Sequence, residues 1–188
     1  AGGAIYTNSQ SVTLSLASTG ASQMSFRNDS GSYGSWVPYA TSHSHMLANT
    51  QGTRTVWVQF RDNAGNVASG GSDTIVLDSV APSAGTVADG SGTDIDVQSS
   101  TSTIQANWSG FSDATSGIDL YQWAIGTTSG GTQTMGWTNS GVSGTKTGLS
   151  LSDGVTYYVS VKAKDKAGNT SSAAISDGVL ANTSGPTG

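Results

Sequence analysis

The chain has 188 residues, of which seven are lysine or arginine and twelve are aspartate, and its formal net charge is −5 at pH 7. This acidic balance argues against nucleic acid and anionic membranes as partners, because no basic patch is present to displace counterions. The sequence contains no cysteine, which excludes disulfides and cysteine-based metal sites. It also lacks any run of about 18 apolar residues, so we expect no membrane insertion.

In the first half of the chain, apolar and polar residues alternate with the period of two that is typical of β-strands. Abundant glycine, serine and aspartate favour turns over helices, and no helical periodicity extends beyond one turn. Pro38 limits the segment 33–39 to an edge strand. The other alternating segments, in chain order, are 12–16, 24–27, 56–60 and 75–77.

The second half repeats this scheme after a short stretch around Pro82. Its alternating segments are 104–108, 121–125, 135–137, 157–163 and 175–180. Turn residues separate the segments at the spacing expected of a β-sandwich. The sequence therefore predicts an all-β protein with two tandem sandwiches, residues 1–80 and 81–188, joined by a short proline-containing linker.

The sequence Asp-x-Ala-Gly-Asn occurs once in each half, at 62–66 and 165–169, and each copy follows an alternating apolar run. We interpret it as a tight turn whose aspartate accepts hydrogen bonds from backbone amides and whose glycine adopts positive φ. A ligand-binding loop is the alternative, since loops carry function, but its presence in both halves favours turn building. The predicted turn residues are Asp62, Gly65, Asn66, Asp165, Gly168 and Asn169.

Residues 151–163 resemble the E–F corner and F strand of a fibronectin type III domain, with a leucine, a turn glycine, a tyrosine and alternating valines in order. Trp108 matches the core tryptophan of strand B, and residues 121–125 resemble strand C. The resemblance implies that the Tyr157 hydroxyl bonds back to the backbone at this corner. The first half is similar to the immunoglobulin-like repeats of bacterial surface proteins, but it has Arg54 where the second half has Tyr157.

Clustered aspartates suggest calcium as a possible cofactor, because calcium prefers several hard oxygen ligands. The alternative is that these acids are solvated turn residues, since their spacing does not match an EF-hand loop. The two histidines, His43 and His45, share one face of a strand but are too few for a structural metal site. The candidate calcium ligands are Asp89, Asp94, Asp96, Asp113 and Asp119.

Aromatic side chains provide a second class of candidate site, because exposed rings stack against sugars and protein partners. The rings that could form such a platform are Tyr33, Trp36, Tyr39, Trp123 and Trp137, and we select Trp36, Tyr39 and Trp137 as candidate contacts. Trp108 and Phe111 are expected in the core. No Gly-x-Ser-x-Gly elbow or strand-to-helix glycine loop occurs, so we expect no enzyme activity.

These features favour a non-catalytic structural or adhesive protein, a repeat-type spacer or a subunit of a surface filament. Its expected partners are other protein domains, copies of itself or surface glycans. The alternative is a carbohydrate-binding accessory module of a larger secreted enzyme. The first residues lack the charged start and apolar core of a signal peptide, so we expect a mature chain or a fragment, located outside the cell or on its surface.

Overall fold

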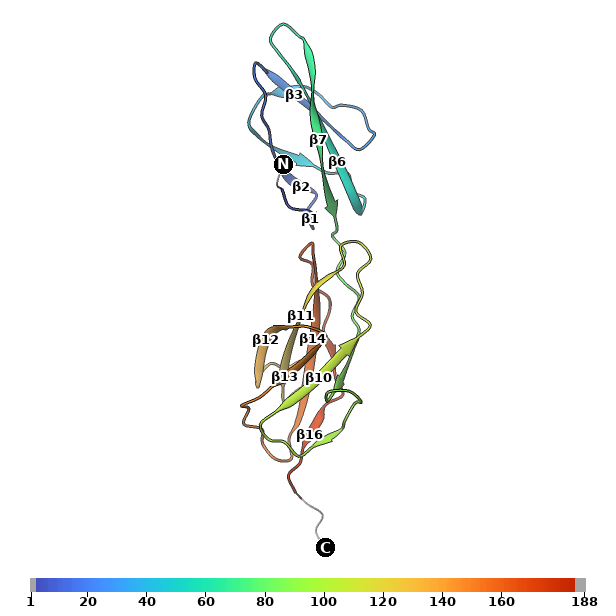
Figure 1. The fold of residues 1–188 in the computed structure, drawn as a ribbon, viewed down its shortest axis with the longest axis vertical. Helices are drawn as coiled ribbons and strands as arrows, with labels where there is room; N and C mark the ends of the chain where they lie inside the picture. The colour runs from blue at the N-terminus through green and yellow to red at the C-terminus, as the bar shows by residue number, and fades with distance from the viewer. Residues whose placement is uncertain (1–2, 185–188) are drawn as a thin grey trace. The chain divides into compact units, whose positions relative to one another are not determined.

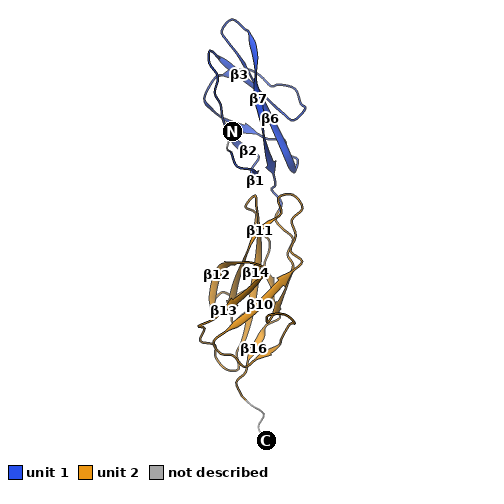
Figure 2. Ribbon diagram, viewed as in Figure 1, with its two compact units in different colours: residues 1–80 blue, residues 81–188 orange. Residues whose placement is uncertain are grey.

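The structure is a computed structural model in which residues 3–184 are described. The chain divides into two compact units, Ala1–Val80 and Ala81–Gly188 (Figure 2). The described residues form strands and turns, and none of them builds a helix with the length and apolarity needed to cross a membrane. The fold is thus the all-β tandem arrangement of immunoglobulin-like and fibronectin type III-like sandwiches that the sequence predicts.

The first unit contains a five-stranded sheet and a two-stranded sheet (Figure 1). The strand order of the larger sheet is β1-β7-β6-β3-β4, and β1 pairs with β7 in parallel. The smaller sheet pairs β2 with β5 in antiparallel fashion. The strands are β1 (Tyr6–Thr7), β2 (Ser11–Ser15), β3 (Gln23–Asn28), β4 (Val37–Pro38), β5 (Ser42–Met46), β6 (Gly52–Arg61) and β7 (Val67–Leu77).

Alternation along β3 and β6 builds the core of the first unit. Successive side chains on a strand point to opposite faces, so every second residue faces the smaller sheet. The buried apolar residues are Met24, Phe26, Leu47, Val56, Val58, Phe60 and Leu77.

Strand β7 is longer than the sequence predicts, because it includes the run Ser69-Gly70-Gly71-Ser72. Glycine is depleted in strands, and the alternating pattern in the sequence covers only 75–77 of this strand. A Cβ at Gly70 would lie 2.3 Å from Cε2 of Phe60, which shows that the strand passes directly over this ring. Gly71 has φ +96° and lies beside a register shift between Val58 and Gln59. The glycines therefore allow a bulged strand to approach the core closely.

The second unit has a three-stranded sheet of order β13-β10-β8 and a larger sheet of order β12-β11-β14-β16-β9, with β15 also paired to β14. Strand β9 pairs in parallel with β16, as β1 does with β7 in the first unit. The strands are β8 (Thr86–Asp89), β9 (Val97–Gln98), β10 (Ile104–Ser109), β11 (Ile118–Gly126), β12 (Met135–Ser140), β13 (Ser143–Lys146), β14 (Thr156–Asp165), β15 (Ala174–Ile175) and β16 (Val179–Ala181).

Two tryptophans lie at the centre of the second core. Trp108 and Trp123 are 5% and 4% exposed, and their ring centroids are 6.1 Å apart. Gly144 on β13 makes room for Trp123, because a Cβ there would lie 2.6 Å from the indole. Phe111 is buried at the edge of this cluster. The expectation that Trp108 and Phe111 are core residues is confirmed, whereas the idea that Trp123 joins an exposed platform is wrong because its ring is buried in this core.

Candidate functional site

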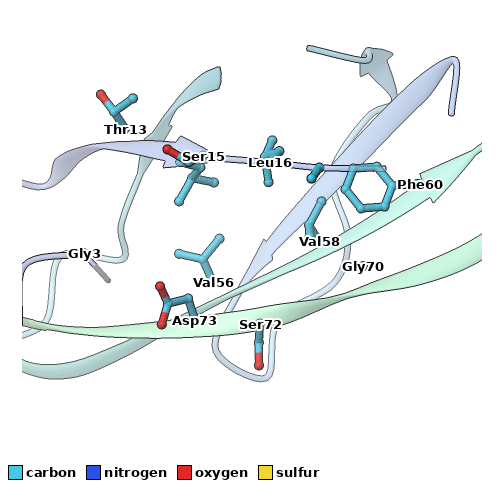
Figure 3. Close-up of a pocket in the computed structure, with 12 residues that line it drawn as sticks. Gly3, Thr13, Ser15, Leu16, Val56, Val58, Phe60, Gly70, Ser72 and Asp73 are labelled. Carbon is cyan, nitrogen blue, oxygen red and sulfur yellow. The ribbon is translucent and has the colours of Figure 1, made fainter. Parts of the chain in front are cut away.

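A groove of about 340 Å³ with a mixed polar and apolar lining opens between β2 and β7 in the first unit (Figure 3). Leu16 and Phe60 line one part of it, with Val56 and Val58 below them in this view. Two further hollows continue the groove along the same edge of the sandwich, past Thr7 and Ile75. The groove therefore reaches the edge of the core, where Val56, Val58 and Phe60 line it while remaining buried.

One wall of this groove is the unpaired edge of β2. The pairing register places Leu14 opposite His43, and the backbone N–H of Leu16 donates to the carbonyl of Thr41 at 2.9 Å. Hydrogen-bonding direction alternates along a strand, so the backbone groups of Thr13 and Ser15 point away from β5 and toward the groove. No strand within residues 3–184 pairs with this edge.

The second unit has a strand at the corresponding place. Its β10–β13 pair is the topological counterpart of β2–β5, and β8 pairs with the other edge of β10. Val87 of β8 packs against the core of this unit. The groove in the first unit thus lies where β8 lies in the second.

The two Asp-x-Ala-Gly-Asn segments form the same hydrogen-bonded turn. The carboxylate of Asp62 accepts bonds from the backbone N–H and the side-chain amide of Asn66, each at 2.9 Å. Asp165 accepts the corresponding bonds from Asn169 at 2.8 and 2.7 Å. The glycines of the turns, Gly65 and Gly168, have φ +88° and +100°.

These bonds have an electrostatic consequence for Asp62. The side-chain and backbone hydrogen bonds from Asn66 are the main causes that lower the pKa of Asp62, and the N–H of Ala64 adds to them. The carboxylates of Asp62 and Asp165 thus accept hydrogen bonds from the backbone of their own turns, which is the turn-building role.

The predicted corner residue Tyr157 is 4% exposed, and its hydroxyl accepts a 2.8 Å hydrogen bond from the backbone N–H of Ser152. In the first unit, Arg54 instead forms an ion pair with Asp29 at 3.1 Å. The other carboxylate oxygen of Asp29 accepts the backbone N–H of Thr55 at 2.9 Å. Tyr157 therefore secures the loop before β14, whereas Arg54 secures the end of β3 at Asp29.

The candidate aromatic residues lie in three different environments. Trp36 is partly exposed, and the guanidinium of Arg61 lies 4.5 Å from its ring centroid. Tyr39 packs edge-on against Phe60, and its hydroxyl accepts the N–H of Ser18 at 3.0 Å. Tyr39 is thus a packing residue of the first unit rather than an open contact surface.

Trp137 on β12 is 37% exposed, and the ammonium of Lys162 lies 4.4 Å from its ring centroid. A partly exposed tryptophan that the sequence analysis did not single out, Trp57, stacks with Arg27 at 4.7 Å on the outer face of the larger sheet of unit 1. Its signal in the sequence is its position on β6 between the inward residues Val56 and Val58. These cation–π contacts cover ring surface that a sugar would otherwise use.

The candidate calcium ligands do not gather in one place. Asp89 and Asp94 come together, and Asp177, which the sequence analysis did not consider, joins them within 4.8 Å. Asp96 and Asp119 belong to no acidic group of three among the described residues. Asp96 is only two residues from Asp94, but neighbouring side chains in a loop can point in different directions, so the two acids do not join one group.

Asp113 lies apart from this group and binds its own loop. Its Oδ1 accepts the backbone N–H groups of Gly117 at 2.7 Å and Ser116 at 2.8 Å. Burial alone would raise the pKa of Asp113, but these hydrogen bonds outweigh burial and lower it. Asp113 therefore acts as a turn acid in the second unit.

Asp89 is fully buried, and its environment is electrostatically unfavourable for an anion. Burial is the main cause that raises the pKa of Asp89 to about 6, and the charges of Asp94 and Asp177 raise it further. Hydrogen bonds from Ser176 and Gly178 oppose this rise.

The two histidines pack inside the first unit. His43 stacks on Phe26 with ring centroids 4.5 Å apart, and Nε2 of His45 bonds Oδ1 of Asn28 at 2.9 Å. Burial, followed by the neighbouring His43, lowers the pKa of His45. No third metal-ligating side chain joins them within residues 3–184, so they serve packing.

Comparisons with known proteins support the fold. The chain is similar to fibronectin(III)-like modules of CbhA from Clostridium thermocellum, with 15% identity, 97% of this chain and 90% of that chain covered, and a TM-score of 0.49. Domains A168 to A170 of titin give 16% identity, 96% and 62% coverage and a TM-score of 0.51. A two-domain fibronectin type III segment of chicken tenascin gives 14% identity, 90% and 92% coverage and a TM-score of 0.39.

No protein-family model matches the chain, and no curated protein was found as a relative. The chain spans 62% of the matched titin segment. At these identities the titin likeness shows the fold alone, which is that of immunoglobulin-like and fibronectin type III-like β-sandwiches.

Proposed function

We propose that the protein is a non-catalytic structural module that joins to a second copy of itself by strand pairing at the free edge of β2. The observation that carries this proposal is the β2 edge that no strand within residues 3–184 pairs with, beside a groove lined by polar and apolar residues, at the place that β8 occupies in the second unit. In this proposal the module acts outside the cell or on its surface, as the resemblance to bacterial surface repeats implies.

The composition of the edge supports a second copy as the partner. Sheet edges are usually protected from pairing by lysine, proline or a bulge. Residues 8–18, which contain β2, include none of the charged residues and no proline. Two such edges pair without electrostatic repulsion, in the self-complementary way of a two-fold dimer. The resulting sheet would run β5-β2-β2-β5 and cover part of both grooves.

The test is self-association measured by analytical ultracentrifugation at increasing protein concentration. Thr13→Pro removes an edge N–H without removing a β2–β5 bond, so we expect it to abolish association. Thr13→Val keeps the N–H and serves as the matched control. Circular dichroism checks that both variants remain folded.

A wild-type chain that stays monomeric at the highest attainable concentration would overturn the proposal. Equal association of wild type and the proline variant would also overturn it, because pairing would then involve another surface. If the chain stays monomeric and instead accepts a strand from a different protein at this edge, that protein is the partner and not a second copy.

A second candidate function is carbohydrate binding at Trp137, in an accessory module of a larger secreted enzyme. The observation that favours it is that Trp137 is 37% exposed, which is more than any other tryptophan among the described residues. Glycan-array binding that disappears in Trp137→Ala and persists in Trp36→Ala would support this function. Absence of binding across a broad array would refute it.

A further inference from the structure

Three carboxylates from three separate segments meet at one place in the second unit. Asp89 ends β8, Asp94 lies in the loop that follows it, and Asp177 lies in the loop between β15 and β16. One carboxylate oxygen of each lies within 4.8 Å of those of the other two. Like charges at this separation repel unless a positive charge is bound among them.

Asp89 is the member that most needs such a charge. Its side chain is fully buried, and Oδ2 accepts the backbone N–H of Gly178 at 3.1 Å. Oδ1 is buried and has no hydrogen-bond partner. A buried polar atom without a partner costs about 1–3 kcal/mol, and more when it is charged. Native structures usually compensate such an atom with a partner or an ion.

The protein does not supply a cation of its own to this group. Residues 82–145 and 167–188, which contain all three acids, include no lysine or arginine. The ion pair found within residues 3–184 joins Arg54 to Asp29 in the other unit. A cation bound from solution would supply the positive charge that no ion pair found within residues 3–184 gives these acids.

The loop is held in a conformation that presents its carboxylates. Oδ1 of Asp94 accepts the backbone N–H of Asp89 at 2.6 Å. The side-chain amide of Asn107 donates to the carbonyls of Gly90 and Gly92 at 3.1 and 2.9 Å. These bonds fix the loop against β10, so an ion would meet a largely prearranged set of ligands.

We propose that Asp89, Asp94 and Asp177 bind one calcium ion. The donor set consists of hard oxygens without nitrogen or sulfur, which disfavours zinc and copper. Two ligands at about 2.3–2.6 Å from calcium are separated by at most about 4.6–5.2 Å, so a mutual distance within 4.8 Å is compatible with shared coordination. Magnesium, with ligands at about 2.0–2.1 Å, requires a closer set and retains its water more strongly.

The consequence of binding is a cross-link between the beginning and the end of the second unit. Asp89 and Asp94 belong to its first strand and loop, whereas Asp177 precedes its last strand, β16. The ion would hold these segments together and suppress their local opening. This inference does not depend on strand pairing at β2.

The test uses the full chain after removal of divalent ions with EDTA. Isothermal titration with calcium is compared for wild type, Asp177→Asn and Asp119→Asn. Asp177 and Asp119 are both exposed acids of the second unit, so Asp119→Asn controls for the loss of one charge. We expect Asp177→Asn to bind one calcium ion fewer per chain than wild type, with a Kd for the lost site on the order of 10⁻⁴–10⁻³ M. We expect Asp119→Asn to match wild type.

Thermal unfolding provides a second measurement. Calcium at about 10 mM should raise the melting temperature of wild type by about 5 °C or more, and this rise should shrink in Asp177→Asn and in Asp94→Asn. Magnesium at the same concentration should give a smaller rise. Equal calcium stoichiometry and equal thermal shifts in wild type and both variants would overturn the proposal.

Discussion

The smaller sheet of the second unit has three strands, β13, β10 and β8, whereas its counterpart in the first unit has only β2 and β5. The third strand covers the side of the second core, and its absence leaves a groove lined by Leu14, Leu16 and Phe60 in the first. Within residues 3–184, the same sheet plan therefore produces one closed sandwich and one with an edge that no described strand pairs with. This difference teaches that the first strand decides whether this edge of a sandwich is sealed, because no other described segment reaches it.

Core truncation should reveal this difference most strongly. Ile125→Ala in the closed unit should lower the free energy of unfolding by about 2–5 kcal/mol, because it leaves a cavity in a fully buried site. Leu14→Ala in the open unit should cost about 1 kcal/mol, because Leu14 lines the groove and is only partly buried. Hydrogen exchange with peptide resolution measures each unit separately. Equal costs would contradict the idea that the first unit is open.

One buried group in each unit should make stability depend on pH, in opposite directions. In the second unit, the folded state raises the pKa of Asp89 to about 6, so Asp89 binds a proton more tightly than in the unfolded chain. Without divalent ions, the contribution of Asp89 to stability should fall by up to about 3 kcal/mol as pH rises from about 4 to above 6. Asp94 and Asp177 contribute to this shift through their charges, and Asp89→Asn should remove it.

In the first unit, burial and His43 lower the pKa of His45, so the folded state binds a proton less tightly than the unfolded chain. Its stability should therefore fall as pH decreases through about 6.5, the ordinary pKa of histidine. His45→Gln should flatten this dependence while keeping a side chain that bonds Asn28. Parallel pH profiles for the two units would refute the contrast.

A smaller effect is expected from the hydroxyls that tie loops to the two cores. Tyr157→Phe should destabilise the second unit by about 1–2 kcal/mol, because it leaves the N–H of Ser152 without its acceptor. Tyr39→Phe should cost the first unit less, since Tyr39 is only partly buried and water can replace its hydroxyl at Ser18. Chemical denaturation of the two variants against wild type measures both costs, and a larger effect for Tyr39 would reverse the comparison.

The smallest effect is expected at Arg54, which stands where the second unit has its corner tyrosine. The Arg54 and Asp29 side chains are 19% and 34% exposed, so their ion pair should contribute less than about 1 kcal/mol. Arg54→Gln should cost little, and the cost should decrease at high salt because ions screen the pair. A cost independent of salt would indicate a packing role for the arginine stem instead.

Much of the fold could be predicted because alternation reports directly which face of a strand is buried. The runs around Phe26, Phe60, Trp108 and Val159 all form strands with those residues in the core. The repeated Asp-x-Ala-Gly-Asn segment could be interpreted as a turn because its hydrogen bonds are local, within five residues.

Other strands could not be predicted, because their local residues carry no strand signal. The Ser69–Ser72 part of β7 is stabilised by its approach to Phe60, and β8 is stabilised by pairing with β10. The calcium ligands could be predicted only in part for the same reason. Asp89 and Asp94 are near in sequence, but Asp177 reaches them only because β16 returns to this end of the sandwich.

The sequence by itself determined the all-β class, the duplication of the architectural unit and the core positions of Trp108 and Phe111, since these follow from periodicity and local turn chemistry. The tertiary structure decided which edge remains unpaired, which aromatic rings are covered by cations and which three acids converge. Those properties depend on contacts between residues far apart in the chain, such as Asp89 with Asp177 and Leu16 with Phe60. Such contacts cannot be predicted from local sequence, because strand register and pairing order are fixed only when the whole sheet assembles.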